Sequence, residues 1–183
     1  MAKQPHDRIR VNPLSSPLSA LGPLAPVSAD VFRETCAHFA TGVTVATACN
    51  GDGSPHGLTV STFTPVSLDP PLVLICVDFA PAIHETFRWS PVFGINILAE
   101  DQKWLSIHFA RLPEGGFDQV AWSAGASGVP LLAGVLGWME CAVVNRMDAG
   151  DHTIVIGEVV AAGSREGKPL LYFDRAYRRI EGT

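Results

Sequence analysis

Two long strand-like runs joined by a short turn constrain the fold of this chain most strongly. Residues 135–147 and 152–161 are rich in β-branched and aliphatic residues, and only Asp-Ala-Gly-Asp at 148–151 separates them. A turn this short joins antiparallel strands, whereas parallel strands need a crossover of a dozen or more residues. The sequence therefore predicts a long antiparallel hairpin rather than the strand-helix alternation of a parallel sheet.

The rest of the chain contains more strand patterns than helix patterns. Further strands are predicted at 43–48, 56–63, 72–77, 92–98, 170–173 and 177–180, and short helices at 28–41, 82–89 and 100–111. The continuous aliphatic run 72–77 is typical of a strand buried on both faces. Residues 112–132 are rich in Gly and Pro and are expected to be irregular. We expect a mainly β fold, an antiparallel barrel or sandwich with helices at its edges.

The first 27 residues differ from the rest of the chain. They hold five prolines and show neither helical spacing nor strand alternation. We expect residues 1–27 to be a Pro-rich tail, either disordered or laid as an arm over a partner subunit. The folded domain is predicted to span residues 28–183, because Ser28 precedes an apolar spacing near 3.6 and can cap a helix.

Charge and cysteine usage narrow the classes of function. The net charge of −5 argues against duplex nucleic acid as a partner, because phosphate neutralisation needs a basic face. No apolar run approaches the roughly 20 residues of a membrane helix. The four cysteines have no C-x-x-C spacing and no histidine at zinc-like spacing, so no metal site is expected. We interpret them as reduced core residues of a cytoplasmic protein.

Hydroxyl residues are dense between Gly57 and Leu72. Thr59, Ser61 and Phe63 alternate along one face of the predicted strand, and Thr62 points to the other. Hydroxyls and backbone amides suit both a phosphate and the pyrimidine edge of a flavin. A Thr-rich strand with one wet face would also explain the pattern, so both interpretations stay open.

Two other segments are candidates for chemistry. His152 opens a strand after a Gly-Asp turn, where it would contact a cofactor or nicotinamide, or simply hydrogen-bond the turn carboxylate. Hydride transfer needs two oriented rings more than it needs a general base, so a lone positioned histidine fits it. Thr41, beside the helix-ending Gly42, could touch a ligand. The sequence has no G-x-G-x-x-G and no Walker loop, so a nucleotide would bind without either.

Several segments together resemble the flavin reductase-like family. FATGVTVATA, GLTVSTFTPVSLDPPLVLICVD, VFGINILAEDQ, GVPLL and GDHTIVIGEVV occur in this order, and the resemblance covers about residues 30–181. This is the FMN-binding split-barrel group, which includes the reductase components of two-component flavin monooxygenases. The resemblance implies a six-stranded antiparallel Greek-key split β-barrel with short flanking helices, working as a homodimer. It also implies hydride transfer from NADH or NADPH to FMN or FAD, with reduced flavin passing to a partner monooxygenase.

The resemblance also assigns site residues. His152 of the Gly-Asp-His turn would be the catalytic residue, next to flavin and nicotinamide. The cofactor-binding residues would be Thr41, Thr59, Ser61, Thr62, Phe63, Ser67, Leu68, Ala110 and His152. One segment departs from the family. Residues 79–86 read Phe-Ala-Pro-Ala-Ile-His-Glu-Thr where small hydroxyl residues, Lys or Arg, and Thr usually help to hold the flavin phosphate. The base is missing or replaced by His84, so the sequence does not decide whether the flavin is FMN or FAD.

Two other functions remain as alternatives. The first is a split-barrel module that binds flavin without efficient reductase turnover, which the altered segment 79–86 favours. The second is an oxidase of the pyridoxamine-phosphate type, which needs a basic cluster for the substrate phosphate. Only Arg175, Arg178 and Arg179 cluster in this way.

Overall fold

The computed structural model describes residues 25–79, 83–111 and 116–180. The chain divides into two compact units, residues 1–36 and 37–183, which are described separately. In the first, helix α1 (Ala29–Ala37) follows Ser28, whose hydroxyl accepts a hydrogen bond from the Val31 amide at 3.3 Å, as the sequence predicts. The predicted tail, residues 1–27, lies almost wholly outside the described residues.

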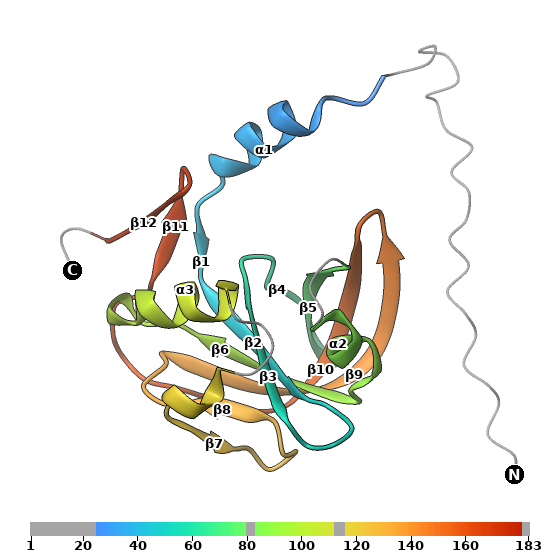
Figure 1. Cartoon of the computed structure of the whole chain (residues 1–183), viewed down its shortest axis with the longest axis vertical. Coiled ribbons are helices and arrows are strands. Elements are labelled where there is room, and N and C mark those ends of the chain that lie inside the picture. Colours follow the sequence, from blue (N-terminus) through green and yellow to red (C-terminus); the bar gives the residue numbers. More distant parts are fainter. Residues whose placement is uncertain (1–24, 80–82, 112–115, 181–183) are drawn as a thin grey trace, which may run out of the picture. The chain divides into compact units, whose positions relative to one another are not determined.

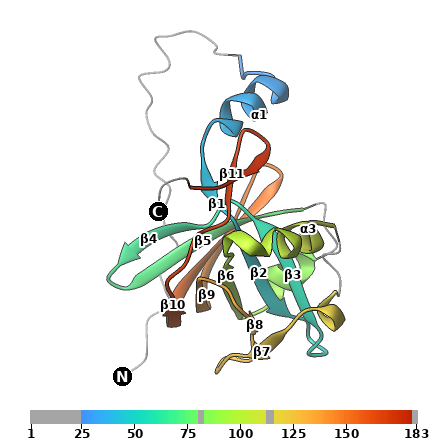
Figure 2. The ribbon, with the colours of Figure 1, turned by 90° about the vertical axis from the view of Figure 1, so that its left-hand side faces the viewer.

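The second unit is built on one antiparallel sheet of seven strands (Figures 1 and 2). The sheet order is β3-β2-β6-β9-β10-β5-β4. The mainly β prediction is confirmed, although this sheet has one strand more than the six expected. The additional strand β4 follows the predicted strand 56–63, which ends early at Val60. The strands are β2 (Thr44–Cys49), β3 (Pro55–Val60), β4 (Thr64–Leu68), β5 (Pro71–Asp78), β6 (Val92–Ile97), β9 (Gly137–Ala149) and β10 (His152–Ser164).

Two smaller sheets accompany the main one. The first has the order β1-β11-β12, formed by β1 (Thr41–Gly42), β11 (Leu171–Phe173) and β12 (Ala176–Arg178). The second pairs β7 (Trp122–Ala124) with β8 (Pro130–Leu132). The prediction that residues 112–132 are irregular was therefore wrong for this hairpin. Its strands have three residues each, too few for an alternating pattern to stand out.

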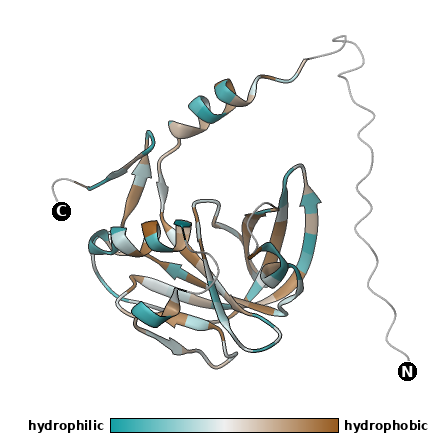
Figure 3. Ribbon diagram, in the orientation of Figure 1, coloured by the Kyte–Doolittle hydropathy of each residue, from teal (hydrophilic) through white to brown (hydrophobic). Residues whose placement is uncertain are grey.

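The faces of the main sheet are unequal. On β5, Val73, Ile75 and Val77 are buried in the core beside Phe87 and Phe93. The residues that alternate with them, Leu72, Leu74 and Cys76, are only half-buried. The prediction that β5 is buried on both faces was therefore wrong for the chain taken alone. Apolar segments run along the strands of this sheet in Figure 3. A largely apolar face is thus left partly open to water.

Short helical elements flank the sheet. Helix α2 (His84–Trp89) buries Phe87, and a 3₁₀ turn, η2 (Glu100–Gln102), leads into α3 (Lys103–Arg111). Another 3₁₀ turn, η3 (Phe117–Gln119), precedes β7. Helix α3 packs on β3, where a Cβ on Gly57 would lie 2.6 Å from the Phe109 ring. Gly57 therefore permits the close approach that positions α3.

The cysteines differ in their surroundings. All four are free, but only Cys141 is fully buried, and Cys36 is exposed. The prediction of four core residues was thus correct for one of them. Burial, assisted by the neighbouring Glu140 carboxylate, raises the pKa of the Cys141 thiol to about 12, which makes it a poor nucleophile. Within the described residues, no helix is long and apolar enough to cross a membrane.

Candidate functional site

His152 lies at the turn of the long β9–β10 hairpin. Its Nδ1 is 2.7 Å from Oδ1 of Asp151, and its side chain is 38% exposed. The hydrogen bond from His152 lowers the pKa of the Asp151 carboxyl, which therefore stays ionised at neutral pH. In the neutral imidazole, donation from Nδ1 leaves Nε2 as an acceptor. The turn thus presents a half-exposed, oriented imidazole.

Strand β5 connects this turn to the hydroxyl-rich segment. His152 pairs with Asp78 on one side of β5, while on the other side Thr62 Oγ1 accepts from the Cys76 amide at 2.9 Å. Because neighbouring strands lie about 4.8 Å apart and Cys76 and Asp78 are two residues apart along β5, Thr62 and His152 are roughly 12 Å apart across the sheet. The structure therefore brings these two predicted residues into one region.

The predicted hydroxyls divide into two groups. Thr59 donates to the Ser106 carbonyl of α3 at 2.8 Å, and Thr62 donates to the Cys76 carbonyl besides accepting from its amide. Both hydroxyls hold the scaffold together. Thr41 and Ser61, in contrast, make no side-chain hydrogen bond within the described part of the chain, and Ser61 is exposed. Strands β2 and β3 pair Thr44 with Val60, so Thr41 and Ser61 lie at one end of this pair.

The other predicted residues have different environments. Phe63 is half-buried against the core cluster, and Leu68, at the β4–β5 turn, is 95% exposed. Ser67 Oγ accepts a hydrogen bond from the Asp69 amide at 3.2 Å. Ala110 is exposed on α3, toward the Gly57 end of β3 and away from Ser61, because Phe109 packs on Gly57. The structure therefore places Thr62 across β5 from His152, and Thr41 and Ser61 at one end of the β2–β3 pair, whereas Ala110 lies toward the other end of β3.

The donor set fits a flavin. Two available hydroxyls, a half-exposed imidazole and a largely apolar sheet face provide hydrogen bonds to a heteroaromatic edge and surface for its ring. When bound, flavin supplies the ring that accepts a hydride. The surroundings of His152 and of the hydroxyls thus suit the chemistry that the sequence motifs imply.

Comparison with known proteins decides the family. The flavin reductase like domain matches residues 36–181. The chain belongs to the flavin reductase-like family. The boundaries agree with the 30–181 expected from the sequence motifs.

Proteins similar to this chain include reductases of flavin. The chain is 43% identical to an FMN reductase (NADH) of Agrobacterium fabrum over 149 residues, 81% of this chain and 84% of that protein. It is also 43% identical to a probable flavin reductase of Rhizobium meliloti, but spans only 45% of that protein's length. A solved NADH:FAD oxidoreductase of Streptomyces globisporus superposes with a TM-score of 0.81 at 37% identity, covering 88% of this chain and 99% of that one.

Residues 79–86, where the sequence departs from the family pattern, contain one buried histidine. His84 is 6% exposed, and its Nε2 lies 2.9 Å from Thr153 Oγ1. The imidazole therefore points into the protein and does not replace a surface base. The neighbouring Glu85 is exposed, and residues 80–82 lie outside the described residues. No described residue from 79 to 86 offers a flavin phosphate an exposed cation.

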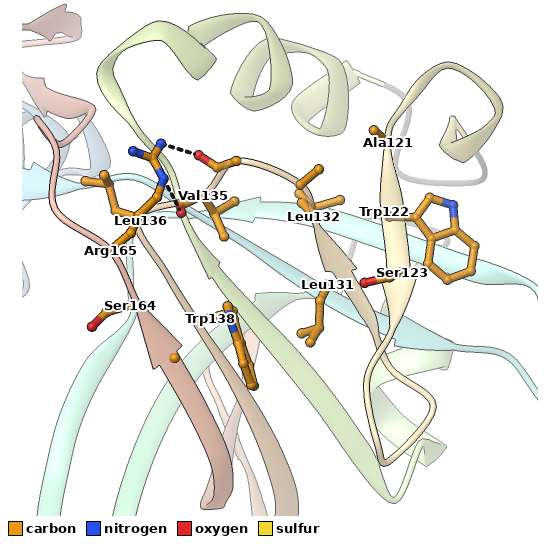
Figure 4. Close-up of a pocket in the computed structure, with 13 residues that line it drawn as sticks. Ala121, Trp122, Ser123, Leu131, Leu132, Val135, Leu136, Trp138, Ser164 and Arg165 are labelled. Carbon is orange, nitrogen blue, oxygen red and sulfur yellow. Dashed lines mark hydrogen bonds between the residues drawn. The ribbon is translucent and has the colours of Figure 1, made fainter.

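A separate pocket lies at the far end of the β9–β10 hairpin (Figure 4). Its volume is about 570 Å³, and Leu131, Trp138 and Arg165 are among its lining residues. Arg165 donates to the Val135 carbonyl at 3.1 Å, so its charge is engaged by the pocket wall. At about 3.3 Å per residue, the length of β10 from His152 to the pocket residue Gly163 is roughly 35 Å along the strand. None of the predicted flavin residues lines it.

The sequence did not reveal the polar chain behind His152. Thr153 donates to Asp148 Oδ1 at 2.9 Å and contacts His84, which lies 69 residues away in the sequence. Threonine in a strand is ordinary, and no local spacing links it to His84. Only the placement of α2 against β10 shows the connection.

Proposed function

We propose that this chain is an NAD(P)H-dependent flavin reductase, which transfers a hydride from NADH or NADPH to FMN or FAD and releases reduced flavin. Its membership of the family supports this, since relatives are named as NADH-dependent reductases of FMN and of FAD. The observation that carries the proposal is the oriented imidazole of His152, which lies across β5 from the hydroxyl-rich segment at Thr62.

His152 has the role of orienting the nicotinamide. With Nδ1 donating to Asp151, Nε2 accepts a hydrogen bond from a carboxamide NH₂. Such a contact fixes the plane of the donor ring without moving a proton. Thr41 and Ser61 hydrogen-bond the flavin directly, whereas Thr59 and Thr62 keep the β3–β4 segment in the shape that flavin requires. Phe63, Ser67, Leu68 and Ala110 complete the flavin contacts in this proposal.

A second copy of the chain covers the open sheet face. Ile154 pairs with Cys76 and Ile156 with Leu74, and all four side chains are only half-buried. A contiguous apolar face of this kind marks an interaction site. Leu68, almost fully exposed beside it, would pack on the partner. We therefore propose a homodimer with flavin bound near the interface.

The finer fold and cellular context follow from the same proposal. Six strands, β3-β2-β6-β9-β10-β5, would form the Greek-key split barrel, and β4 extends its edge. Residues 28–183 form the reductase domain after a tail, 1–27. The reduced flavin passes to a flavin-dependent monooxygenase, as the names of several relatives, such as a 4-nitrophenol monooxygenase reductase component of Rhodococcus opacus, suggest. A cytoplasmic location is in keeping with four free cysteines.

The test is the oxidation of NADH and NADPH, followed by their absorbance, with FMN, FAD, riboflavin or no flavin. Flavin-dependent oxidation in air and under nitrogen is the expected result, and the preferred pair identifies both cofactors. Flavin binding without oxidation would instead support the alternative, a flavin-binding module without efficient turnover.

The role of His152 has its own test. Losing one hydrogen bond of about 1 to 1.4 kcal/mol should lower kcat/KM for NADH about five- to tenfold in His152→Ala. Flavin affinity, measured by fluorescence quenching, should stay nearly unchanged. The control is His56→Gln, near the start of β3, which should behave as the wild type. Equal kcat and KM for NADH in His152→Ala and wild type would refute the assignment.

A further inference from the structure

His84 is a buried histidine that the proposed reaction does not use. It opens helix α2, and its side chain is 8% exposed. Its Nε2 lies 2.9 Å from Thr153 Oγ1 on β10. Thr153 directly follows His152, and its side chain faces the protein interior where that of His152 faces outward.

The hydrogens of this contact can be assigned from donors and acceptors alone. The Thr153 hydroxyl has one hydrogen, which it donates to the Asp148 carboxylate at 2.9 Å. Thr153 Oγ1 must therefore accept from His84, which makes His84 Nε2 the donor. Asp148 and Thr153 are also paired across the hairpin, so the chain His84–Thr153–Asp148 ties α2 to both strands of the turn.

Further contacts converge on the same turn. The Phe79 amide donates to the Asp151 carbonyl at 3.0 Å. The Phe79 ring meets the His84 ring edge-on, with 4.9 Å between ring centroids. The other end of α2 is also held by the hairpin, because Arg146 of β9 donates to the Phe87 carbonyl at 3.0 Å and to the Ser90 carbonyl. Helix α2 is thus clamped against the base of the hairpin turn at both of its ends.

We propose that His84 is a positioning residue, which holds the Gly150-Asp151-His152 turn against α2 through Thr153 and thereby sets the position of the His152 imidazole. His84, which lies where a phosphate-binding base was expected, then has a mechanical role. Because His152 orients the nicotinamide in the proposed function, on which this inference rests, a loosened turn misaligns the hydride donor.

The experiment compares four single variants, and the double variant His84→Leu/Thr153→Val, with the wild type. His84→Leu removes the donor, and His84→Gln retains a donor near the position of Nε2. Thr153→Val removes the middle of the chain. Thr86→Val is the matched control, because Thr86 is buried in α2 but donates to Asn50 Oδ1 and not to the turn.

Two readouts separate positioning from general destabilisation. The first is the hydrogen-exchange rate of the Phe79 amide in the flavin-free protein, which reports opening of its bond to Asp151. The second is steady-state kinetics with NADH, together with flavin affinity. In His84→Leu, the Phe79 amide hydrogen should exchange about tenfold faster than in the wild type. Both kcat and kcat/KM for NADH should fall about tenfold, while flavin affinity stays unchanged. His84→Gln should restore both.

The other variants test whether His84 and Thr153 act through one hydrogen-bonded chain. Thr153→Val should match His84→Leu, and the double variant should be no worse than either, because both break one chain. Thr86→Val should lower the melting temperature yet leave Phe79 exchange and NADH kinetics unchanged. Unaltered Phe79 exchange in His84→Leu, or weaker binding of FMN but not of riboflavin, would overturn the proposal. An inactive wild type would refute the reductase function, while Phe79 exchange would still test the contact.

Discussion

Glu140 of β9 is a buried carboxylate that organises the β7–β8 loop. It is 2% exposed and makes no ion pair among the described residues. Its oxygens accept hydrogen bonds from the amides of Ala126 at 3.0 Å and Ser127 at 2.7 Å, and from the Ser127 hydroxyl. A Cβ on Gly125 would lie 2.5 Å from the Glu140 carboxyl carbon, so the loop wraps closely around the charge.

Glu140→Gln keeps the shape but removes the charge. The amide NH₂ group would face one of the loop's N–H donors, so at least one charge-assisted hydrogen bond, worth about 1.5 to 3 kcal/mol, is lost. For a chain of this size, each 1 kcal/mol shifts the melting temperature by about 2–4 °C. We expect the variant to melt about 3–12 °C below the wild type at neutral pH.

The difference in melting temperature between the wild type and Glu140→Gln should depend on pH. Burial raises the pKa of Glu140, but the hydrogen bonds from the Ser127 hydroxyl and the Ser127 and Ala126 amides outweigh it, so the pKa lies below its ordinary value of 4.5. A depressed folded-state pKa stabilises the protein fully above pH 4.5 and loses that contribution as the pH falls through the folded value. The difference in melting temperature between the wild type and Glu140→Gln should therefore become smaller below pH 4.5.

Thermal melts by circular dichroism, at neutral pH and in acid, provide the assay. Glu158→Gln on β10 is the control, because Glu158 is half-buried and forms no ion pair among the described residues. Equal melting temperatures for the two variants would refute the reasoning. A gap that widens in acid would contradict the direction of the pKa shift.

Two further predictions test the sheet. Ile154→Lys places a charge on the open apolar face, so light scattering should show a monomer with weakened flavin binding; an unchanged dimer would place the interface elsewhere. Gly157→Ala places a Cβ 2.5 Å from Phe93 and 2.9 Å from Cys141, so overpacking should cost about 1–3 kcal/mol in urea unfolding. A urea midpoint for Gly157→Ala equal to that of the wild type would show that the core relaxes around the added methyl group.

Sequence patterns predicted the elements whose periodicity is long. The hairpin formed by β9 and β10 was confirmed nearly to its ends, because 13-residue strands carry many alternating positions. The β7–β8 hairpin was not predicted, since its three-residue strands are specified by Glu140 from another strand. Burial on both faces of β5 was also not borne out, because a continuous aliphatic run does not reveal whether its second face meets the same chain or another.

The sequence predicted which segments form the candidate site, but not the hydrogen bonds that their side chains make. The Gly-Asp-His motif identified the turn on which His152 is found, and the hydroxyl cluster identified the region beside β5. Density of hydroxyls did not reveal that Thr59 and Thr62 bond to the protein backbone. The orientation of His84 was equally hidden, because it depends on the packing of α2 against β10.

The exposed Glu85 offers a last test of how the chain handles the flavin phosphate. The family resemblance puts the phosphate near residues 79–86, where His84 points inward and Glu85 is the exposed charge. Glu85 Oε2 accepts from Trp89 Nε1 at 2.8 Å, a bond that Glu85→Gln can retain. Removing one negative charge about 10 Å from a phosphate dianion in water gains roughly 0.4–0.8 kcal/mol.

Glu85→Gln should therefore bind FMN about two- to fourfold more tightly at low salt, as measured by fluorescence quenching. Riboflavin lacks the phosphate and is the internal control, so its affinity should not change. The gain should fade at 1 M salt, where the screening length falls to about 3 Å. Equal gains for FMN and riboflavin would mean that the substitution acts on packing around Trp89. No gain for either would place the phosphate away from this segment, and the missing base would then have no bearing on flavin choice.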